Sequence, residues 1–519
     1  MGADGTALHS ALSPNIEIGI VGAGAMGAGI AQVAAIAGHP IRIVDVRKDT
    51  ADAAIASIRA NIGKLVAKGR LTAEDGAAAQ CALHPASTVA DLAACGLVIE
   101  AIVEDLTAKR ALFHQIEAVV ATDALLATNT SSLSITAIGA ELQHPERLAG
   151  LHFFNPATVM LLVEVISGAA TAVWIAQTLY ATVSRWGKVP VLARSSPGFI
   201  VNRVARPFYA EALRVLNEGT ADPATLDAIV RESGGFRMGP CELMDLIGHD
   251  VNYAVTRSVF DAFYGDPRFT PSVLQFELVQ AGYLGRKTGR GFYDYSENAP
   301  GVLAATHPPV SAPGRVRLFG QNDLVERLAL AKIPAERLGQ HVDGRIAACE
   351  SCVLYRSDGR TATARAASTG VQNTIVIDLV LDAATFTRAA IAPADQCERA
   401  AVLDAVGLLQ AAGLAVSVIG DIPGMIVLRT VAMLANEAAD AVNQGVCSAA
   451  DCDLAMRKGV NYPRGPLEWA EYLGLSRVVE VLDNIAKAYG EDRYRVSPLL
   501  RRKALAGGHF LDRRDARNV

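Results

Sequence analysis

The chain has 519 residues, of which 51% are apolar and 19% are charged. This length predicts about three to four domains, and the apolar content favours packed cores over disorder. The formal net charge of −5 is small for the length, so it excludes the basic footprint of a protein that binds nucleic acid or an anionic membrane.

Targeting and redox signals are weak. No apolar run reaches the length of about 18 residues that a membrane-spanning helix needs, and residues 1–14 lack the basic-then-apolar pattern of a secretory signal. The cysteines are scattered, and only Cys349 and Cys352 form a CxxC pair. Without a second pair or nearby histidines, coincidence is favoured there over a metal or redox site, and no metal is predicted. Free thiols predict a reducing, cytoplasmic location.

Residues 16–45 have the layout of a dinucleotide-binding unit. They predict a buried strand, a glycine-rich turn, a helix of small residues, a second strand and an acidic residue, in that order. The complete set is far more specific than the glycine pattern alone. Its parts are Ile16–Val21, Gly22-Ala23-Gly24-Ala25-Met26-Gly27, Ala28–Ala37, Ile41–Val44 and Asp45.

Each part of this unit has a physical purpose. Gly22 permits the tight turn, Gly24 lets the backbone approach a pyrophosphate, and Gly27 lets the helix lie close to the strand. The positive end of the helix favours the phosphate charge. Asp45 can accept hydrogen bonds from both hydroxyls of the adenine ribose and would repel a 2′-phosphate, which favours NAD over NADP. Arg47 weakens that preference.

Strand-like and helix-like segments alternate over residues 14–195, which predicts a parallel sheet with helices on both faces. The further strands are expected at Gly96–Ala101, Ala124–Asn129, Leu148–Phe154 and Leu161–Ile166, and helices at Ala51–Lys68 and Lys109–Val120.

Residues 197–290 predict helices, at Val201–Asn217, Pro223–Ser233 and Pro240–Tyr264. The basic, glycine-rich turn Gly285–Tyr295 follows, and it is equally consistent with a phosphate contact and with a solvated turn. Residues 297–310 resemble a linker. Residues 315–420 hold short apolar runs, such as Ala347–Tyr355, without a GxGxxG pattern, and predict a small α/β domain that could be a degenerate nucleotide domain.

Residues 423–510 repeat the first helical segment at a constant offset, without a gap. Pro197–Asn202 is echoed by Pro423–Leu428, so the polar Asn202 of the first copy becomes Leu428 in the second. Other pairs at this offset are Glu211 and Glu437, Gly219 and Gly445, Gly239 and Gly465, Glu242 and Glu468, and Gly248 and Gly474.

The predicted fold class is therefore an α/β Rossmann-type NAD-binding domain followed by duplicated all-α domains, with a small α/β segment between the copies. The predicted boundaries are 14–196 for the nucleotide domain, 197–296 and 421–510 for the helical domains, and 297–420 for the linker and small segment.

His152 is the leading candidate for moving a proton while hydride moves. It ends a buried strand, and Glu164 lies 12 residues later on the next apolar run, past a proline turn. Neighbouring strands would set carboxylate against imidazole, fixing its tautomer and raising its basicity. The alternative is a satisfied core histidine. The other nine histidines are expected in loops or on polar faces, without such a partner.

Polar residues also follow two predicted strands. Residues 128–132 carry hydroxyls and the Asn129 amide at a strand end, where ligands of α/β sheets bind. A Ser/Thr turn or helix cap is the equal alternative. Glu104 and Lys109 follow another strand end and have the same two interpretations.

Taken together, these residues resemble the L-3-hydroxyacyl-CoA dehydrogenase family. The resemblance covers residues 14–296, and residues 423–510 match the family's helical domain again. The motifs that carry it are Gly22–Asp45, Glu100–Glu104, Asn129–Leu133, Gly150–Pro156, Leu162–Ile166, Ser196–Arg203, Gly239–Asp245 and Gly285–Tyr295.

The resemblance implies roles for the candidate residues. His152 would be the acid/base on the 3-hydroxyl group and Glu164 its orienting partner, while Ser131 and Asn202 would hydrogen-bond the substrate or the histidine region. The nicotinamide and ribose would be lined by Glu104, Lys109, Asn129 and Asn155. Lys68 stands where the family has a lysine that meets a coenzyme A phosphate, and Asn61 replaces a serine that accompanies it in some members.

The implied reaction is the reversible, NAD-dependent oxidation of a (3S)-3-hydroxyacyl-CoA to the 3-oxoacyl-CoA. Long, duplicated forms resemble bacterial enzymes of phenylacetate degradation that act on 3-hydroxyadipyl-CoA, and 3-hydroxybutyryl-CoA dehydrogenases. Two alternatives remain: a non-catalytic NAD-binding interaction protein, and a dehydrogenase of a free hydroxy acid or sugar acid.

The expected partner is an acyl-CoA thioester, with no nucleic acid and no membrane. In short members of the family the helical domains pair between subunits. The second helical copy here would allow that pairing within one chain, so either a monomer or a homodimer is expected.

Overall fold

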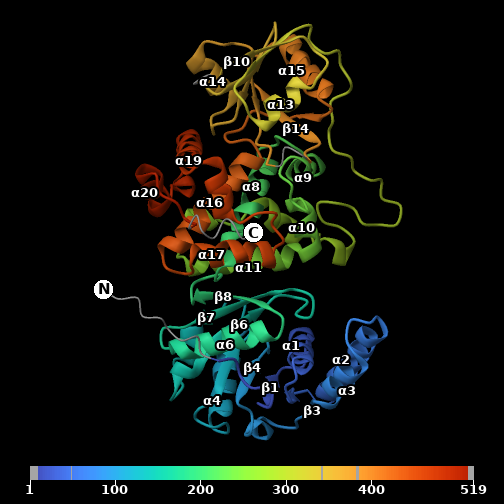
Figure 1. Ribbon diagram of the computed structural model, residues 1–519, viewed down its shortest axis with the longest axis vertical. Coiled ribbons are helices and arrows are strands. Elements are labelled where there is room, and N and C mark those ends of the chain that lie inside the picture. Colours follow the sequence, from blue (N-terminus) through green and yellow to red (C-terminus); the bar gives the residue numbers. More distant parts are fainter. Residues whose placement is uncertain (1–9, 48, 340–342, 382–384, 512–519) are drawn as a thin grey trace. The chain divides into compact units, whose positions relative to one another are not determined.

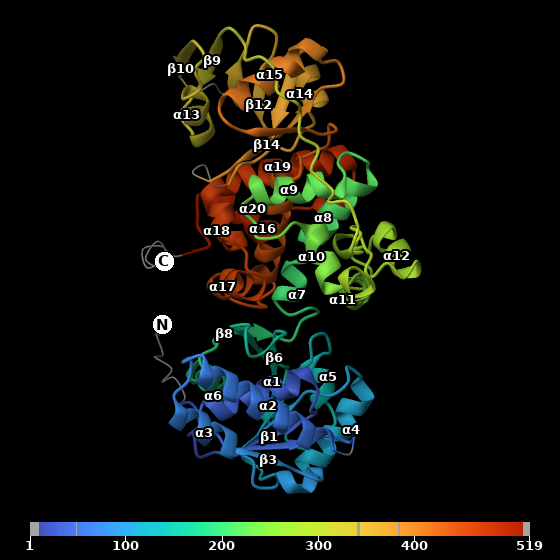
Figure 2. The ribbon, with the colours of Figure 1, turned by 90° about the vertical axis from the view of Figure 1, so that its right-hand side faces the viewer.

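The computed structural model describes residues 10–47, 49–339, 343–381 and 385–511. The chain divides into two units (Figures 1 and 2). The first unit comprises residues 1–203 and 444–461, and the second comprises residues 204–443 and 462–519. The first nine residues, for which no signal pattern is predicted, lie outside the described residues.

An eight-stranded sheet forms the centre of the first unit, counted over its described residues, in the order β3-β2-β1-β4-β5-β6-β7-β8. All neighbouring strands are parallel except β6 and β7, which run antiparallel. The strands are β1 (Ile18–Val21), β2 (Ile41–Val44), β3 (Leu83–Pro85), β4 (Leu97–Glu100), β5 (Leu125–Thr128), β6 (Leu148–Phe153), β7 (Leu162–Ser167) and β8 (Val189–Arg194).

Helices pack against this sheet because the strands are apolar on both faces. They are α1 (Ala25–Ile36), α2 (Thr50–Ala67), α3 (Ala73–Cys81), α4 (Leu106–Glu117), α5 (Ile135–Gly139) and α6 (Val173–Arg185). One helix of the second helical copy, α17 (Ala449–Gly459), also belongs to the first unit and lies against β7 and β8. Just before α17, the carbonyl of Val446 accepts a hydrogen bond of 2.8 Å from the backbone N–H of Arg194.

The helices of both copies pack together in the second unit. From the first copy they are α8 (Arg206–Asn217), α9 (Pro223–Glu232), α10 (Pro240–Ile247), α11 (His249–Ala262) and α12 (Val273–Gln280). From the second copy they are α16 (Val427–Asn443), α18 (Pro466–Leu473), α19 (Leu475–Tyr489) and α20 (Pro498–Ala506). Helix α16 is buried along nearly its whole length and contacts α8, α18, α19 and α20, so it is the centre of this unit.

Two of the helices predicted from the sequence are broken. Val201–Asn217 divides at Ala205 into α7 (Val201–Val204) and α8. Pro240–Tyr264 divides at Gly248, whose φ of 99° no helix accommodates. A glycine adopts this conformation without the steric cost that another residue would bear.

The second unit also contains a seven-stranded sheet, counted over its described residues, in the order β10-β9-β11-β12-β13-β14-β15. The strands are β9 (Val316–Phe319), β10 (Ala335–Leu338), β11 (Arg345–Ala348), β12 (Val353–Arg356), β13 (Thr374–Ile377), β14 (Arg388–Pro393) and β15 (Ala415–Val418). Its helices are α13 (Asp323–Ala329), α14 (Ala362–Thr369) and α15 (Arg399–Ala411). The run Ala347–Tyr355 is therefore not one strand: β11 and β12 form a hairpin, and Cys349 and Cys352 form its turn.

This small sheet continues the internal repeat. The sequence offset between Pro197 and Pro423 also applies to the secondary structure. Strand β14 begins and ends at this offset from β7, and helix α15 begins and ends at the same offset from α6. Strands β13 and β14 are antiparallel, as β6 and β7 are, and β15 is parallel to β14, as β8 is to β7. The segment is thus a shortened copy of the second half of the nucleotide-binding fold, and the predicted fold class is confirmed.

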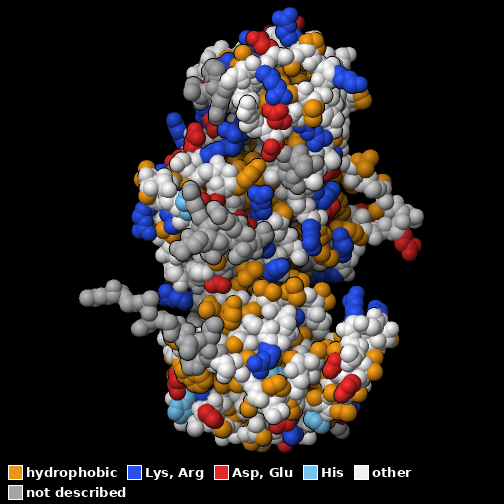
Figure 3. Space-filling model, viewed as in Figure 1, with side chains coloured by type: hydrophobic (Ala, Val, Ile, Leu, Met, Phe, Trp, Pro, Cys, Tyr) orange, Lys and Arg blue, Asp and Glu red, His pale blue; other side chains and the backbone are white. Residues whose placement is uncertain are grey.

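The surface carries both signs of charge. On the face in Figure 3, basic and acidic side chains are interspersed among apolar and neutral ones. Among the helices of the described residues, none is both long enough and apolar enough to cross a bilayer.

Candidate active site

The glycine-rich turn leaves β1 at Gly22 and enters α1. Gly22 has a φ of 103°, and a Cβ at Gly27 would collide with the Gly22 carbonyl oxygen. Gly24 is the N-cap of α1, and nothing lies within 4 Å of where its Cβ would be. The open side of the turn therefore leaves the free N–H groups at the start of α1, at Ala25 and Met26, accessible to a phosphate.

Asp45 directly follows β2, beside this turn. Its carboxylate accepts hydrogen bonds from the backbone N–H groups of Ala23 and Arg47, both at 2.9 Å, and from Arg47 Nε at 3.1 Å. Burial acts to raise the pKa of Asp45, but the bonds from Arg47 and Ala23 outweigh it and lower that pKa. The lowered pKa favours the ionised carboxylate as a hydrogen-bond acceptor. Arg47 lies beside it, as in the prediction that Arg47 weakens the preference for NAD over NADP.

A cavity of about 750 Å³ runs along these residues. Gly22, Gly24, Asp45 and Arg47 line one side of it, and the segment 101–103 after β4 lines another. This volume lies in the range of about 300–1,000 Å³ that is typical of cofactor sites. The open glycine turn, including the helix N-cap Gly24, and the Asp45 carboxylate border the same space, so the residues present fit a dinucleotide.

A buried ionic cluster lies at the ends of β4 and β5. Lys109 is 1% exposed, and its Nζ lies 2.6 Å from Glu100 Oε1 and 3.3 Å from Glu104 Oε2. The Glu100 carboxylate also accepts hydrogen bonds from Thr128 Oγ1 and the Ile102 N–H. The sequence motif contains Glu100, but its role as the anchor of Lys109 was not predicted. Its signal is a charged residue in an otherwise apolar strand.

Glu104 organises the loop after β5. Its Oε1 accepts hydrogen bonds from Thr130 Oγ1 at 2.7 Å and from the backbone N–H groups of Ser131 and Ser132 at 2.9 and 3.0 Å. Burial acts to raise the pKa of Glu104, but these bonds and Lys109 outweigh it and lower that pKa. The polar segment after β5 is therefore held in place by an acid on the neighbouring strand end.

His152 and Glu164 face each other across β6 and β7. The strand register pairs them directly, and His152 Nδ1 lies 2.6 Å from Glu164 Oε2. The imidazole is 6% exposed and Glu164 is fully buried, and the rings of Phe154 and Phe199 lie beside the imidazole. Because a carboxylate accepts from Nδ1–H, Nε2 is the ring atom left to exchange a proton.

The second carboxylate oxygen of Glu164 contacts the backbone instead of the imidazole. Oε1 accepts hydrogen bonds from the backbone N–H groups of Ile200 and Val201, at 2.9 and 3.0 Å. The adjacent Asn202 Nδ2 donates to the Ser131 carbonyl over 3.4 Å, and Asn129 Oδ1 accepts from the Phe153 N–H at 2.9 Å. The ends of β5 and β6 and the segment 200–202 thus meet around the imidazole.

Three predicted site residues lie outside this network. Asn155 follows β6 and is exposed, with no side-chain bond to the others among the described residues. Asn61 is exposed on α2, and Lys68 is the exposed C-cap residue that follows α2. Their proposed contacts depend on a ligand and stay predictions.

The prediction that no other histidine has a carboxylate partner is wrong. His249 Nε2 lies 2.7 Å from Asp245 Oδ1, and both side chains are fully buried in the second unit. Asp245 also accepts hydrogen bonds from the backbone N–H groups of Phe292 and Tyr293, and a Cβ at Gly291 would collide with its carboxylate. The pair therefore anchors the turn 285–295. The missed signal is an acid and a histidine four residues apart across Gly248.

The basic side chains of that turn have partners within the second unit. Lys287 pairs with Asp250 at 2.5 Å, and the Arg290 guanidinium lies 4.1 Å from the centre of the Tyr283 ring. Arg286 lies over Tyr295 at 5.6 Å. These contacts favour a structural turn over a phosphate-binding one.

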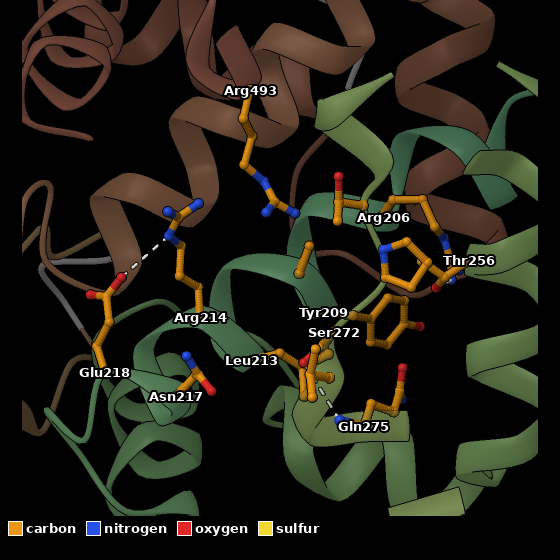
Figure 4. Close-up of a pocket in the computed structure, with 14 residues that line it drawn as sticks. Arg206, Tyr209, Leu213, Arg214, Asn217, Glu218, Thr256, Ser272, Gln275 and Arg493 are labelled. Carbon is orange, nitrogen blue, oxygen red and sulfur yellow. Dashed lines mark hydrogen bonds and ion pairs between the residues drawn. The ribbon is translucent and has the colours of Figure 1, made fainter. Parts of the chain in front are cut away.

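Arginines also gather where the two helical copies meet. A cavity of about 260 Å³ beside α8 is lined by Arg206, Arg214 and Arg493 (Figure 4). Arg214 pairs with Glu218 and Glu491, and Arg206 Nη1 donates to Thr256 Oγ1 at 3.0 Å. These contacts tie the cavity to the packing of the two copies.

The second copy lacks the histidine. At the offset of the internal repeat, Asp378 stands at the place of His152 and Ala390 at that of Glu164. Asp378 Oδ2 accepts hydrogen bonds from the backbone N–H groups of Ile426 and Val427, at 3.0 and 2.7 Å. The backbone bonds of the first copy are therefore kept while the imidazole is lost.

Metal and disulfide chemistry find no support in the part of the chain that the structure describes. It holds no group of three or more His, Cys, Asp or Glu side chains that could bind a metal ion. All eight cysteines are free thiols.

Comparison with known proteins shows matches to three family models. The family model for the 3-hydroxyacyl-CoA dehydrogenase NAD-binding domain matches residues 17–196, and the model for the C-terminal domain of the same enzymes matches residues 198–295 and 424–511. The 3-hydroxybutyryl-CoA dehydrogenase reduced Rossmann-fold domain matches residues 354–423.

Individual relatives extend the match to nearly the whole chain. The 3-hydroxyadipyl-CoA dehydrogenase of Escherichia coli K12 is 44% identical over 488 residues, which cover 94% of this chain and 97% of the relative. The 3-hydroxybutyryl-CoA dehydrogenase of Bradyrhizobium diazoefficiens is 39% identical over 284 residues, covering 55% of this chain and 97% of that protein. A crystal structure of 3-hydroxybutyryl-CoA dehydrogenase from Escherichia coli K12 has a TM-score of 0.87 and 44% identity, covering 95% of this chain and 99% of that one.

These matches confirm the predicted family resemblance and the predicted NAD cofactor. The chain belongs to the 3-hydroxyacyl-CoA dehydrogenase family and is an NAD-dependent enzyme of that family.

Proposed function

We propose that this chain oxidises 3-hydroxyadipyl-CoA to 3-oxoadipyl-CoA, with 3-hydroxybutyryl-CoA as the second candidate substrate. The single observation that carries the chemistry is the buried His152–Glu164 pair, whose Nδ1···Oε2 distance is 2.6 Å. The adipyl group is favoured because a relative that matches 94% of this chain is named for that substrate. The similar crystal structure is that of a 3-hydroxybutyryl-CoA dehydrogenase, which keeps the second candidate open.

In the proposed mechanism, His152 Nε2 removes the proton of the 3-hydroxyl group. NAD⁺, when bound, accepts the hydride that leaves C3. As the O–H bond breaks, its electron pair forms the C3=O double bond, and the proton stays on the imidazole. Glu164 stabilises the resulting imidazolium through Nδ1–H. In the reverse direction the imidazolium protonates the developing alkoxide.

The surrounding residues would position the reactants. We assign Ser131 and Asn202 to hydrogen bonds with the substrate or the histidine region, since the Asn202 amide already reaches the Ser131 carbonyl. The nicotinamide and its ribose would be held by Glu104, Lys109, Asn129 and Asn155. Lys68, with Asn61 nearby on α2, would meet a coenzyme A phosphate; its exposed position is compatible with that contact.

We further propose that the boundaries 14–196, 197–296, 297–420 and 421–510 delimit the functional modules. The packing of α8 against α16 supports pairing of the helical copies within one chain, and so a monomer. Free thiols support a cytoplasmic location.

The test is NADH formation by the purified chain with NAD⁺ and either (3S)-3-hydroxyadipyl-CoA or (3S)-3-hydroxybutyryl-CoA. A higher kcat/KM for the dicarboxylic substrate supports the proposal, and a higher value for the four-carbon substrate selects the second candidate. Turnover of free hydroxy acids alone, or NAD binding without any turnover, would overturn both.

A further inference from the structure

A second cavity lies at the carboxyl edge of the small sheet, wholly within the second unit. Its volume is about 290 Å³. The ends of β12 and β13, the start of α13 and the junction of α18 with α19 border it. Its apolar wall includes Leu324, Ile346, Leu379 and Leu473, and its basic residues are Arg356 and Arg477. Ligands of α/β sheets bind outside the carboxyl ends of the strands, so this is a position where a ligand is expected.

The cavity is the counterpart, in the second copy, of the region around His152. Asp378, at the place of His152, borders it. In the strand register, Arg356 lies opposite Ile377, the counterpart of Leu151 at the repeat offset. Extending the β5–β6 register by one residue places Asn129 opposite Leu151, so Arg356 is the counterpart of Asn129. Arg477 stands at the place of Val251, by the same offset. The second copy has therefore exchanged an imidazole, an amide and an aliphatic side chain for a carboxylate and two guanidinium groups.

The two guanidinium groups have unused hydrogen-bonding capacity. Among the described residues, Arg356 makes no side-chain hydrogen bond or ion pair, and Arg477 donates one bond, from Nη2 to the Ser357 carbonyl over 3.4 Å. Arg356 is exposed and Arg477 is half-buried. Partial desolvation of each guanidinium group lowers its pKa, and the charge of Arg356 further lowers the pKa of Arg477, to about 10. An anion between them would relieve this repulsion.

Nearby acids compensate only in part. Glu480 acts to raise the pKa of both arginines, and Asp358 acts to raise that of Arg477, but neither outweighs burial. Asp358 is itself paired with Arg360 and Arg365. The Asp378 oxygens accept hydrogen bonds from backbone N–H groups. Asp323, the first residue of α13, also lines the cavity.

We propose that this cavity binds a small organic carboxylate. Its carboxylate would lie between Arg356 and Arg477, whose planar guanidinium groups match two oxygens, and its aliphatic body would contact the apolar wall. A phosphate dianion fits less well, because it gains nothing from that wall and is repelled more strongly by Asp323. The site is independent of the chemistry at His152.

Isothermal titration calorimetry of the full chain in low-salt buffer tests this, with butyrate as the probe and phosphate as the comparison. Saturable butyrate binding at one site per chain is expected. Arg356→Gln and Arg477→Gln should each weaken it by about tenfold to a hundredfold, as the loss of a charged hydrogen-bond donor predicts. Arg399→Gln, at the exposed start of α15, is the matched control and should bind as the unaltered chain does.

Two further readouts complete the test. The unliganded melting temperature of Arg477→Gln should equal or exceed that of the unaltered chain, because a repulsion is removed; a fall would indicate a purely structural arginine and overturn the proposal. His152→Ala should leave butyrate binding unchanged. Butyrate binding that survives both arginine changes, disappears with His152→Ala, or is replaced by phosphate binding alone would also overturn it.

Discussion

Asp378 occupies in the second copy the position that His152 holds in the first. It also accepts the backbone hydrogen bonds that correspond to those of Glu164. In each copy a carboxylate accepts hydrogen bonds from two successive backbone N–H groups, at Ile200 and Val201 or at Ile426 and Val427. The second copy has therefore kept a carboxylate that accepts from these two N–H groups, although it has lost the imidazole. In the first copy Glu164 accepts from the two N–H groups with Oε1 and contacts His152 with Oε2.

Replacing His152 with Ala should abolish most turnover while NAD binding persists. The imidazole is the proposed proton acceptor, and general acid–base catalysis of this kind contributes about 10²–10⁴-fold. Steady-state kinetics gives the loss in kcat, and fluorescence titration with NADH gives the affinity. His144→Ala, which alters an exposed histidine, is the control. Unchanged kcat in His152→Ala would contradict the assigned role.

The two tasks of Glu164 should separate by substitution. Glu164→Gln retains an oxygen for the Ile200 and Val201 N–H groups but supplies no carboxylate to His152, so kcat should fall by about 10²-fold with little loss of stability. Glu164→Ala leaves both N–H groups without an acceptor and should cost about 1–3 kcal/mol for each in addition.

Asp378→Ala is the counterpart in the second copy. It should lower the free energy of unfolding in the same way, yet leave kcat at saturating substrate unchanged, because no imidazole depends on it. Urea unfolding and kinetics on the three variants measure both quantities. Equal stability of Glu164→Ala and Glu164→Gln would refute the separation.

The sequence predicted the fold class and the central pair because both depend on local patterns. The strand–turn–helix–strand–acid order identified the nucleotide unit, and the 12-residue spacing of His152 and Glu164 across a turn matched paired strands. The exchange at Asp378 was not predicted, because residues 374–420 keep the register of the first copy but not its residue types. The Asp245–His249 pair was missed because it depends on Gly248, which divides the predicted helix.

Glu104→Gln should alter how stability depends on pH. The folded-state pKa of Glu104 is lowered from 4.5, so its ionised form contributes stability that is present above pH 4.5 and is lost as the pH falls through the lowered folded value. The unaltered chain should therefore exceed Glu104→Gln in melting temperature at neutral pH, and the difference should shrink below pH 4.5. Subtracting the two curves cancels the other carboxylates. A difference that does not change with pH would show that Glu104 acts through hydrogen-bond geometry alone.

A buried ion pair joins the two helical copies, and a double substitution can test its contribution to stability. Arg429 Nε on α16 lies 2.6 Å from Glu211 Oε2 on α8, and Tyr494 Oη donates to the same oxygen at 2.9 Å. Both charged side chains are almost fully buried. Arg429→Met would leave the Glu211 carboxylate without its main partner, which should cost about 3–5 kcal/mol in the free energy of unfolding.

Adding Glu211→Gln to Arg429→Met should recover most of that loss, because the uncompensated charge is removed with its partner. Arg501→Met is the control: its pair with Asp483 is exposed, so it should cost less than about 1 kcal/mol. If the copies pair within one chain, the unaltered protein should sediment as a monomer, and Arg429→Met should lose stability without a dependence on protein concentration. A dimer that dissociates on Arg429→Met would instead show that the contact joins two chains.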